Sequence, residues 1–163
     1  MPIRHTDKGW YWGSKGPFAT KTQAQAVARA AYAHGYKGES ITEGSIMVEE
    51  FVSGLLHSVT ITHIYHLKSP SYSQHMALGS FYEGMGDLVD GLIEAYQGKY
   101  GLIEDYVMDA GEHSDYPLEY MIGLSDFVAQ GRKDFPQDSE LQNMIDEIAS
   151  LIDSTIYKLR FLK

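Results

Sequence analysis

The sequence predicts an all-α protein, a four-helix bundle preceded by a small aromatic strand or hairpin and a short helix. After residue 43, apolar residues recur every three or four positions over four long stretches, which is the pattern of one buried helix face. Proline and glycine fall between these stretches, where helices commonly end. We therefore expect an N-terminal part at residues 1–40 and a bundle at residues 43–163.

The composition restricts the class of protein. The 163 residues can bury a core, and the hydrophobic content of 44% is that of a globular protein. No apolar run reaches the roughly 20 residues that span a bilayer, and the first residues lack a signal-peptide core, so we expect neither a membrane nor an exported protein. The chain has no cysteine, which excludes disulfides and thiolate metal sites. A net charge of −9, without a long Lys/Arg cluster, argues against nucleic-acid binding.

The N-terminal part begins with aromatic residues. Trp10, Tyr11 and Trp12 precede a turn-rich stretch that ends at Phe18, so we expect a short strand or hairpin. Two interpretations stay open: an arm packed on the bundle, or a separate module that binds a partner. In the second case, these four aromatic side chains would supply the contacts, because Trp and Tyr contribute much interface energy.

A helix should begin near Thr20. Thr20 and Gln23 have capping-box spacing, in which each side chain bonds the backbone amide of the other residue. The alanine-rich residues 24–31 favour a helix, and Gly35 is placed to end it.

The first two long helices should be separated by Ser69 and Pro70. The first begins near Glu43. The second covers about residues 71–96, and Gly98 and Gly101 mark its end. Their apolar stripes consist of Val48, Phe51, Val52, Leu55, Leu56 and Val59 in the first, and Leu78, Phe81, Met85, Leu88, Val89, Leu92 and Tyr96 in the second.

A longer connection should lead to the third helix, and residues 102–107 within it predict a short connecting helix. Pro117 opens the third helix at its favoured first-turn position, and Gly131 and Pro136 close it. Asp138 or Ser139 should cap the last helix, which has the clearest stripe. That stripe consists of Leu141, Met144, Ile145, Ile148, Leu151, Ile152, Thr155, Ile156 and Leu159.

Acidic residues line one face of the second helix. Glu83, Asp87, Asp90 and Glu94 are 4, 3 and 4 residues apart, which places them on one side, away from the apolar face. Such faces are often only solvated. A cation would, however, relieve the repulsion between carboxylates one turn apart.

Histidines occur close to this face in the sequence. His63 and His66 follow the apolar stripe of the first helix, and His75 lies one turn inside the second, at the border of the acidic face. Imidazole nitrogen together with carboxylate oxygen suits iron, zinc or manganese. Histidines hydrogen-bonded within the core are the alternative interpretation. The candidate metal ligands are His63, His75, Asp90 and Glu94, with His66, Glu83 and Asp87 as further candidates.

The order His63, His75, Asp90, Glu94 resembles the Dps branch of the ferritin-like proteins, which are iron-oxidising miniferritins. The resemblance implies a ferritin-like four-helix bundle in a homo-oligomer that binds iron and acts as a ferroxidase. It also implies that the histidines come from one subunit and the acids from its dimer mate. Where the family has tryptophan after the first histidine, this chain has Ile64, or Leu67 if His66 is the counterpart. A further acid of the family is Gly79 here.

A second resemblance is to an uncharacterised family of small tailed-phage proteins, carried by residues 71–79, 98–101 and 141–147. Residues 9–18 are similar to a short module appended to various phage proteins. This resemblance implies a phage origin and a bundle of unassigned role. With the composition, which fits a cytosolic or particle-enclosed protein, we expect a location in the host cytoplasm or phage particle. The alternative function is therefore a non-catalytic scaffold that binds a phage or host protein.

Overall fold

The computed structural model describes residues 3–12, 15–23 and 46–162. The chain divides into two compact units, residues 1–44 and residues 45–163, which we describe separately. It is mostly helical, with a small antiparallel sheet at the N-terminus. Among the described helices, none combines the length and apolar character required to cross a bilayer.

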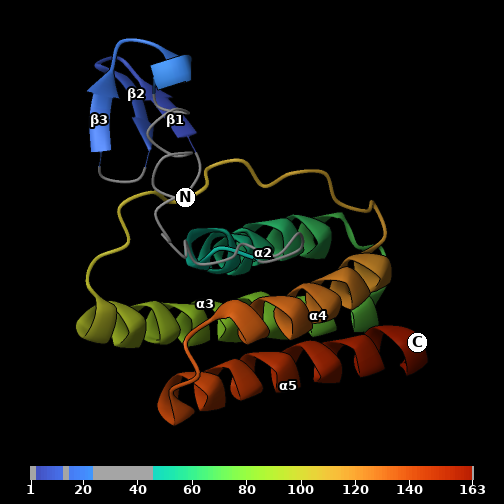
Figure 1. The fold of residues 1–163 in the computed structure, drawn as a ribbon. Helices are drawn as coiled ribbons and strands as arrows, with labels where there is room; N and C mark the ends of the chain where they lie inside the picture. Colours follow the sequence, from blue (N-terminus) through green and yellow to red (C-terminus); the bar gives the residue numbers. More distant parts are fainter. Residues whose placement is uncertain (1–2, 13–14, 24–45, 163) are drawn as a thin grey trace. The chain divides into compact units, whose positions relative to one another are not determined.

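The N-terminal unit contains a three-stranded antiparallel sheet with strand order β1-β2-β3 (Figure 1). The strands are β1 (Ile3–Thr6), β2 (Gly9–Trp12) and β3 (Lys15–Phe18). The prediction of one strand or hairpin therefore gave too few strands. The stretch that was expected to be only a turn includes β3. Pro17 fits there because β3 is an edge strand, where a missing amide is tolerated.

The predicted capping box after the sheet is confirmed. The Thr20 amide donates to Gln23 Oε1, and the Gln23 amide donates to Thr20 Oγ1, both at 3.3 Å. Residues 21–23 are helical. The rest of the helix expected up to Gly35 lies outside the described residues.

Four long helices follow in the described part of the second unit. They are α2 (Val48–Lys68), α3 (Tyr72–Tyr100), α4 (Pro117–Asp134) and α5 (Ser139–Phe161). Ser69 is the C-cap of α2, as predicted from Pro70, and the Ser71 side chain caps α3 by accepting from the Gln74 amide. Pro117 lies in the first turn of α4, also as predicted.

The predicted start of the first helix was wrong, and the predicted ends of the second and third were right only in part. Helix α3 is capped by Gly101 and α4 ends just before Pro136, as expected, but neither helix ends at Gly98 or Gly131. Helix α2 begins at Val48 rather than near Glu43, because Met47 has an extended backbone with ψ of 152°. Helix α3 continues past Gly98 to Gly101, whose φ of 94° favours glycine. Gly131 lies inside α4, where the ring of Phe51 packs against its backbone and leaves no space for a Cβ.

Each helix contacts two others: α2 packs on α3 and α4, and α5 packs on the same two helices. Helices α2 and α5 end where α3 and α4 begin, so every contacting pair is antiparallel (Figure 1). The segment of residues 101–116 runs from the end of α3 back to the start of α4 (Figure 1). We call it the crossover segment.

The crossover segment is irregular, so the predicted helix at residues 102–107 is wrong. Sixteen residues would reach only about 24 Å as a helix but about twice that when extended. Two of its amides bond side chains of the helices instead. The Val107 amide donates to Ser53 Oγ at 2.9 Å, and the Ile103 amide donates to Gln97 Oε1 at 3.0 Å.

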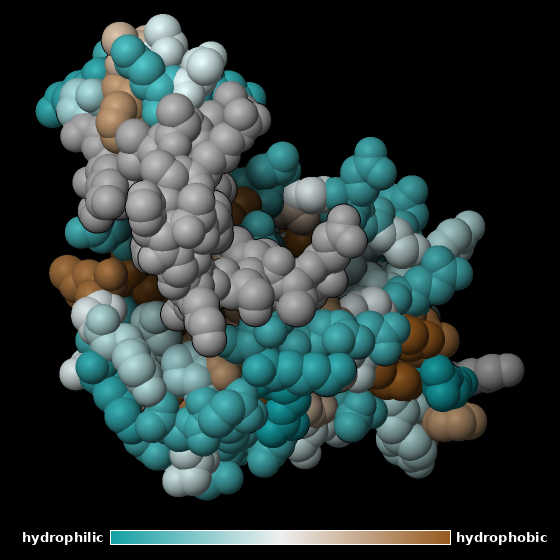
Figure 2. Space-filling model, in the orientation of Figure 1, coloured by the Kyte–Doolittle hydropathy of each residue, from teal (hydrophilic) through white to brown (hydrophobic). Residues whose placement is uncertain are grey.

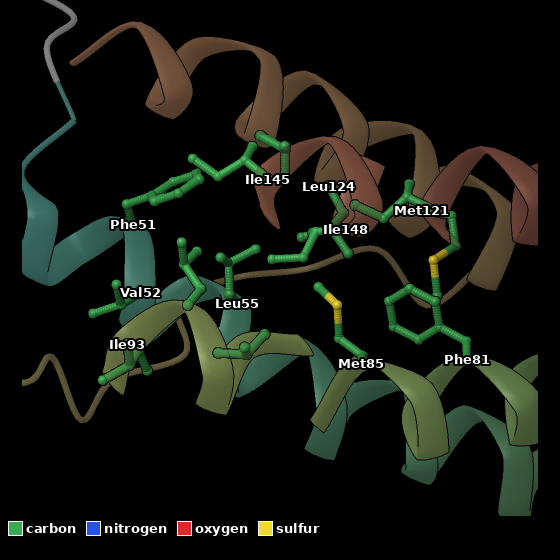
Figure 3. Packing of buried hydrophobic residues seen from close by; sticks show 14 of the residues in the cluster. Phe51, Val52, Leu55, Phe81, Met85, Ile93, Met121, Leu124, Ile145 and Ile148 are labelled. Atoms are coloured by element: carbon green, nitrogen blue, oxygen red, sulfur yellow. The ribbon is translucent and has the colours of Figure 1, made fainter. Parts of the chain in front are cut away.

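The core lies between the four helices, and all of them contribute to it (Figure 3). Its fully buried side chains include Phe51, Phe81, Met85, Met121, Ile145 and Ile148. The predicted stripes supply most of the core, although Leu56 is exposed and Leu88 and Tyr96 are only partly buried. The buried polar side chains among the described residues are Ser53, Ser58, Thr62 and Thr155. The described core therefore contains no carboxylate or imidazole that could bind a metal between the helices.

Candidate functional site

Two histidines face each other across the turn between α2 and α3. The rings of His66 and His75 stack with centroids 3.6 Å apart and an angle of 24° between their planes. His66 Nδ1 lies 2.8 Å from the backbone oxygen of His75, and His75 Nδ1 lies 2.9 Å from the backbone oxygen of His66. Both side chains are partly buried. Each histidine thus bonds the backbone of the other, and the pair joins the last turn of α2 to the first turn of α3.

This arrangement determines the tautomer of both rings. A carbonyl oxygen can only accept a hydrogen bond, so each Nδ1 must be the donor. In the neutral ring, Nε2 then keeps its lone pair. Metal-binding histidines commonly donate their other nitrogen to a backbone carbonyl in the same way, which orients the ring. His66 and His75 therefore each have a fixed ring and one nitrogen available for a ligand.

His63 lies beside this pair but faces a different residue. Its ring stacks on Tyr82 of α3, with centroids 4.3 Å apart, and lies 6.0 Å from the His66 ring. Tyr82 also meets the His66 ring edge to face at 5.3 Å. The sequence analysis missed Tyr82, although its place seven residues after His75 on one helix face was a usable signal.

Gly79 of α3 packs close to the His66 ring. A Cβ at this position would lie 3.2 Å from both Cε1 and Nδ1 of His66. A side chain here would therefore require the His66 ring to move by a few tenths of an ångström.

The acidic residues of α3 lie elsewhere. Glu83, Asp87, Asp90 and Glu94 are all exposed, on the side away from the core as predicted. Asp90 follows His75 by 15 residues on one continuous helix, a rise of about 22 Å. One chain therefore cannot bring His75 and Asp90 to the same ion. Within the described residues, no three His, Asp or Glu side chains are grouped to hold a metal.

The aromatic residues of the N-terminal unit form a small cluster on the sheet. The ring of Trp10 lies 4.5 Å from that of His5, and Lys21 Nζ lies 5.6 Å from the Trp10 ring centroid. Phe18 of β3 lies opposite Trp10 in the strand register. Trp10, Tyr11 and Phe18 are each partly exposed. Trp12 belongs to β2, but its side chain lies outside the described part.

Comparison with known proteins gives a family but no activity. No curated protein and no solved structure matches the chain. Residues 66–159, more than half of the chain, match the model of a family of unknown function. The match begins at His66 and includes His75 and the acidic face of α3. The chain belongs to this family, DUF5856.

Proposed function

We propose that the helical unit is a ferritin-like four-helix bundle. Ferritin-like bundles have one long crossover connection, whereas simple up-and-down bundles have only short loops. Residues 101–116 connect α3 to α4 along the length of the helices, and all contacting helices are antiparallel. The proposal rests on this connectivity.

We further propose that the protein binds iron through the α2–α3 histidines. The observation that supports this most is the reciprocal bonding of His66 and His75, which orients both rings and leaves both Nε2 atoms available. His66 thus becomes a primary candidate beside His75, with His63 as a neighbouring ligand. Neutral imidazole and carboxylate together suit iron, although they also suit zinc and manganese.

The carboxylates must come from a second copy, since Asp90 and Glu94 are too far from His75 in one chain. In a two-fold dimer the same surface patch of both copies forms the interface. One interface would therefore bring the acids of each chain to the histidines of the other. Exposed apolar side chains offer surface for such an interface: Leu67, Tyr72 and Phe161 are 70%, 79% and 63% exposed. Figure 2 shows hydrophobic surface near the C-terminus. The chemistry of a miniferritin would follow, in which paired ferrous ions are the substrate and pass electrons to oxygen or peroxide.

The test is the iron content of purified protein after anaerobic incubation with ferrous ions and desalting. We expect about one or two irons per chain, with loss in His66→Ala/His75→Ala and in Asp90→Ala/Glu94→Ala. A control, Glu147→Ala/Asp153→Ala, removes two exposed acids of α5 and should keep the iron. Iron retained in both test variants would contradict the proposed ligands. A monomer by light scattering would contradict the shared site.

The second candidate function is a scaffold that binds a phage or host protein through the N-terminal sheet. It is favoured by the separate N-terminal unit and by the partly exposed Trp10, Tyr11 and Phe18. Absence of iron in the wild type, together with partner binding that is lost in Trp10→Ser, would favour the scaffold. Partner binding unchanged in Trp10→Ser and Tyr11→Ser would count against it.

A further inference from the structure

A second feature of the helical unit is a hollow of about 380 Å³ that is lined by residues of α2, the crossover segment and α4. Pockets for small organic ligands have volumes of about 300–1,000 Å³. Its floor is apolar and includes Leu124 and Phe127, and its polar residues include Glu112 and Glu119. Its residues belong neither to the histidine pair nor to the acidic face of α3.

Two helical glycines line this hollow, Gly123 of α4 and Gly54 of α2. A Cβ on Gly123 would meet no atom within 4 Å, so the space in front of this residue is open. A Cβ on Gly54 of α2 would lie 2.6 Å from the Phe127 ring, which packs directly against the glycine. Glycine within a helix is less favourable than alanine. Helices α2 and α4 nevertheless each have a glycine where they line the hollow.

The walls are held by contacts within the chain. Ser114 Oγ donates to Glu119 Oε2 at 2.8 Å, and the Tyr65 hydroxyl donates to the backbone oxygen of Ser114. The Tyr120 ring meets the rings of Tyr65 and His113 at 5.5 and 6.1 Å. The hollow is thus formed without a ligand, as most binding pockets are.

The lining favours a positive charge. Glu112 and Glu119 supply carboxylates, and the lining includes no lysine or arginine; its remaining titratable side chains are the imidazoles of His57 and His113 and the phenol of Tyr120. Aromatic faces such as those of Tyr120 and Phe127 also attract cations. Burial raises the pKa of Tyr120, so its phenol stays protonated, and no hydrogen bond to its hydroxyl exists among the described residues. A bare metal ion fits poorly, because no three ligating side chains are grouped in the described residues.

We propose that this hollow binds a small organic cation with an apolar body. The body would lie on Leu124 and Phe127, the charged group beside Glu112 and Glu119, and a polar atom would bond the Tyr120 hydroxyl. The inference is independent of iron binding, because it uses no residue of the proposed metal site.

The test uses three probes that share a phenyl ring: phenethylammonium, the neutral 2-phenylethanol and the anion phenylacetate. Each is titrated into the ¹⁵N-labelled full chain, and amide shift changes give the position and the Kd. Gly123→Leu puts a side chain into the opening, and Gly86→Leu is its control. Gly86 is also a helical glycine whose Cβ would meet nothing within 4 Å, but it lies on α3. Leucine favours helix more than glycine does, so both variants should fold.

We expect phenethylammonium to shift amides around the hollow and to bind at least tenfold more tightly than phenylacetate. Gly123→Leu should weaken that binding at least tenfold, and Gly86→Leu should leave it unchanged. Glu112→Gln/Glu119→Gln should weaken the binding of phenethylammonium and leave the binding of 2-phenylethanol unchanged. Equal binding of all three probes, shifts elsewhere on the chain, or undiminished binding in Gly123→Leu would overturn the proposal.

Discussion

His66 and His75 each bond the other's backbone carbonyl through Nδ1, at 2.8 and 2.9 Å, while their rings stack 3.6 Å apart. The same contacts that hold the α2–α3 turn also orient two imidazoles. The pair therefore contributes to stability whether or not a metal binds, and this contribution can be measured without metal.

The first prediction concerns the stability of metal-free protein. His66→Ala and His75→Ala should each lower the free energy of unfolding by about 1 kcal/mol, because each removes one hydrogen bond and abolishes the stacking between the two rings. The backbone carbonyls survive in both variants. The coupling in a double-mutant cycle, expected at about 0.5 kcal/mol or more, therefore reports mainly on the stacked rings.

Urea unfolding in the presence of a chelator measures these values. His57→Ala is the matched control, because His57 lies on the same helix two and a half turns earlier and should change stability by no more than about 0.5 kcal/mol. Additive effects of the two alanines would show that the rings do not act as a pair.

The second prediction concerns Gly79. Alanine for glycine in a helix ordinarily stabilises by about 0.5–1 kcal/mol. At Gly79 the new Cβ would lie 3.2 Å from the His66 ring, so the ring must shift and the gain should be lost. Gly86→Ala on the same helix meets nothing within 4 Å and should show the full gain. Equal stabilisation by both substitutions, measured by thermal unfolding, would mean that the His66 ring is not held against Gly79.

Sequence patterns predicted the helices well because their signals are local. Pro70 and Pro117 act on their own backbone neighbours, and a stripe of apolar residues marks the buried face of its own helix. The crossover segment was mispredicted because its conformation depends on distant groups. The Val107 amide, for example, is bonded by Ser53, 54 residues earlier. Likewise, Lys15–Phe18 contains turn-forming residues but becomes a strand by pairing with β2.

The candidate site was only partly predictable for the same reason. Spacing alone left open whether His63 or His66 corresponds to the first histidine of the miniferritin pattern. It also could not show which of them meets His75, because that depends on how α2 packs on α3. His66 stacks on His75 and lies against Gly79, whereas His63 stacks on Tyr82. In the proposed site Asp90 and Glu94 come from a second chain, and the pattern of a single helix carries no information on such a contact.

The third prediction concerns Gly131, which the sequence suggested as a helix end but which lies inside α4. Gly131→Ala would push a Cβ into the Phe51 ring, and overpacking of this kind costs about 1–3 kcal/mol. Gly123→Ala, two turns earlier on the same helix, meets open space and should stabilise by about 0.5–1 kcal/mol. Chemical unfolding should therefore give changes of opposite sign for two identical substitutions. The same sign for both would contradict the close packing of α4 on Phe51.

The last prediction concerns pH and the contacts between the end of α3 and the start of α5. Lys99 Nζ donates to Glu140 at 2.8 Å and to Asp138, and the Tyr100 hydroxyl also donates to Asp138. These hydrogen bonds lower the pKa of Asp138 and Glu140 below their ordinary values of 3.8 and 4.5. Depressed folded-state pKa values favour folding above the ordinary values, and the benefit is lost as the pH falls through the lowered ones.

Replacing Lys99 by methionine should therefore destabilise the protein at pH 6.5, and the difference from wild type should shrink towards pH 3. Because these groups are exposed, the difference at pH 6.5 should also decrease in high salt. Urea unfolding of both proteins across this pH range measures the effect. A difference that stays constant from pH 6.5 to 3 would mean that Lys99 acts through packing of its aliphatic chain rather than through the two carboxylates.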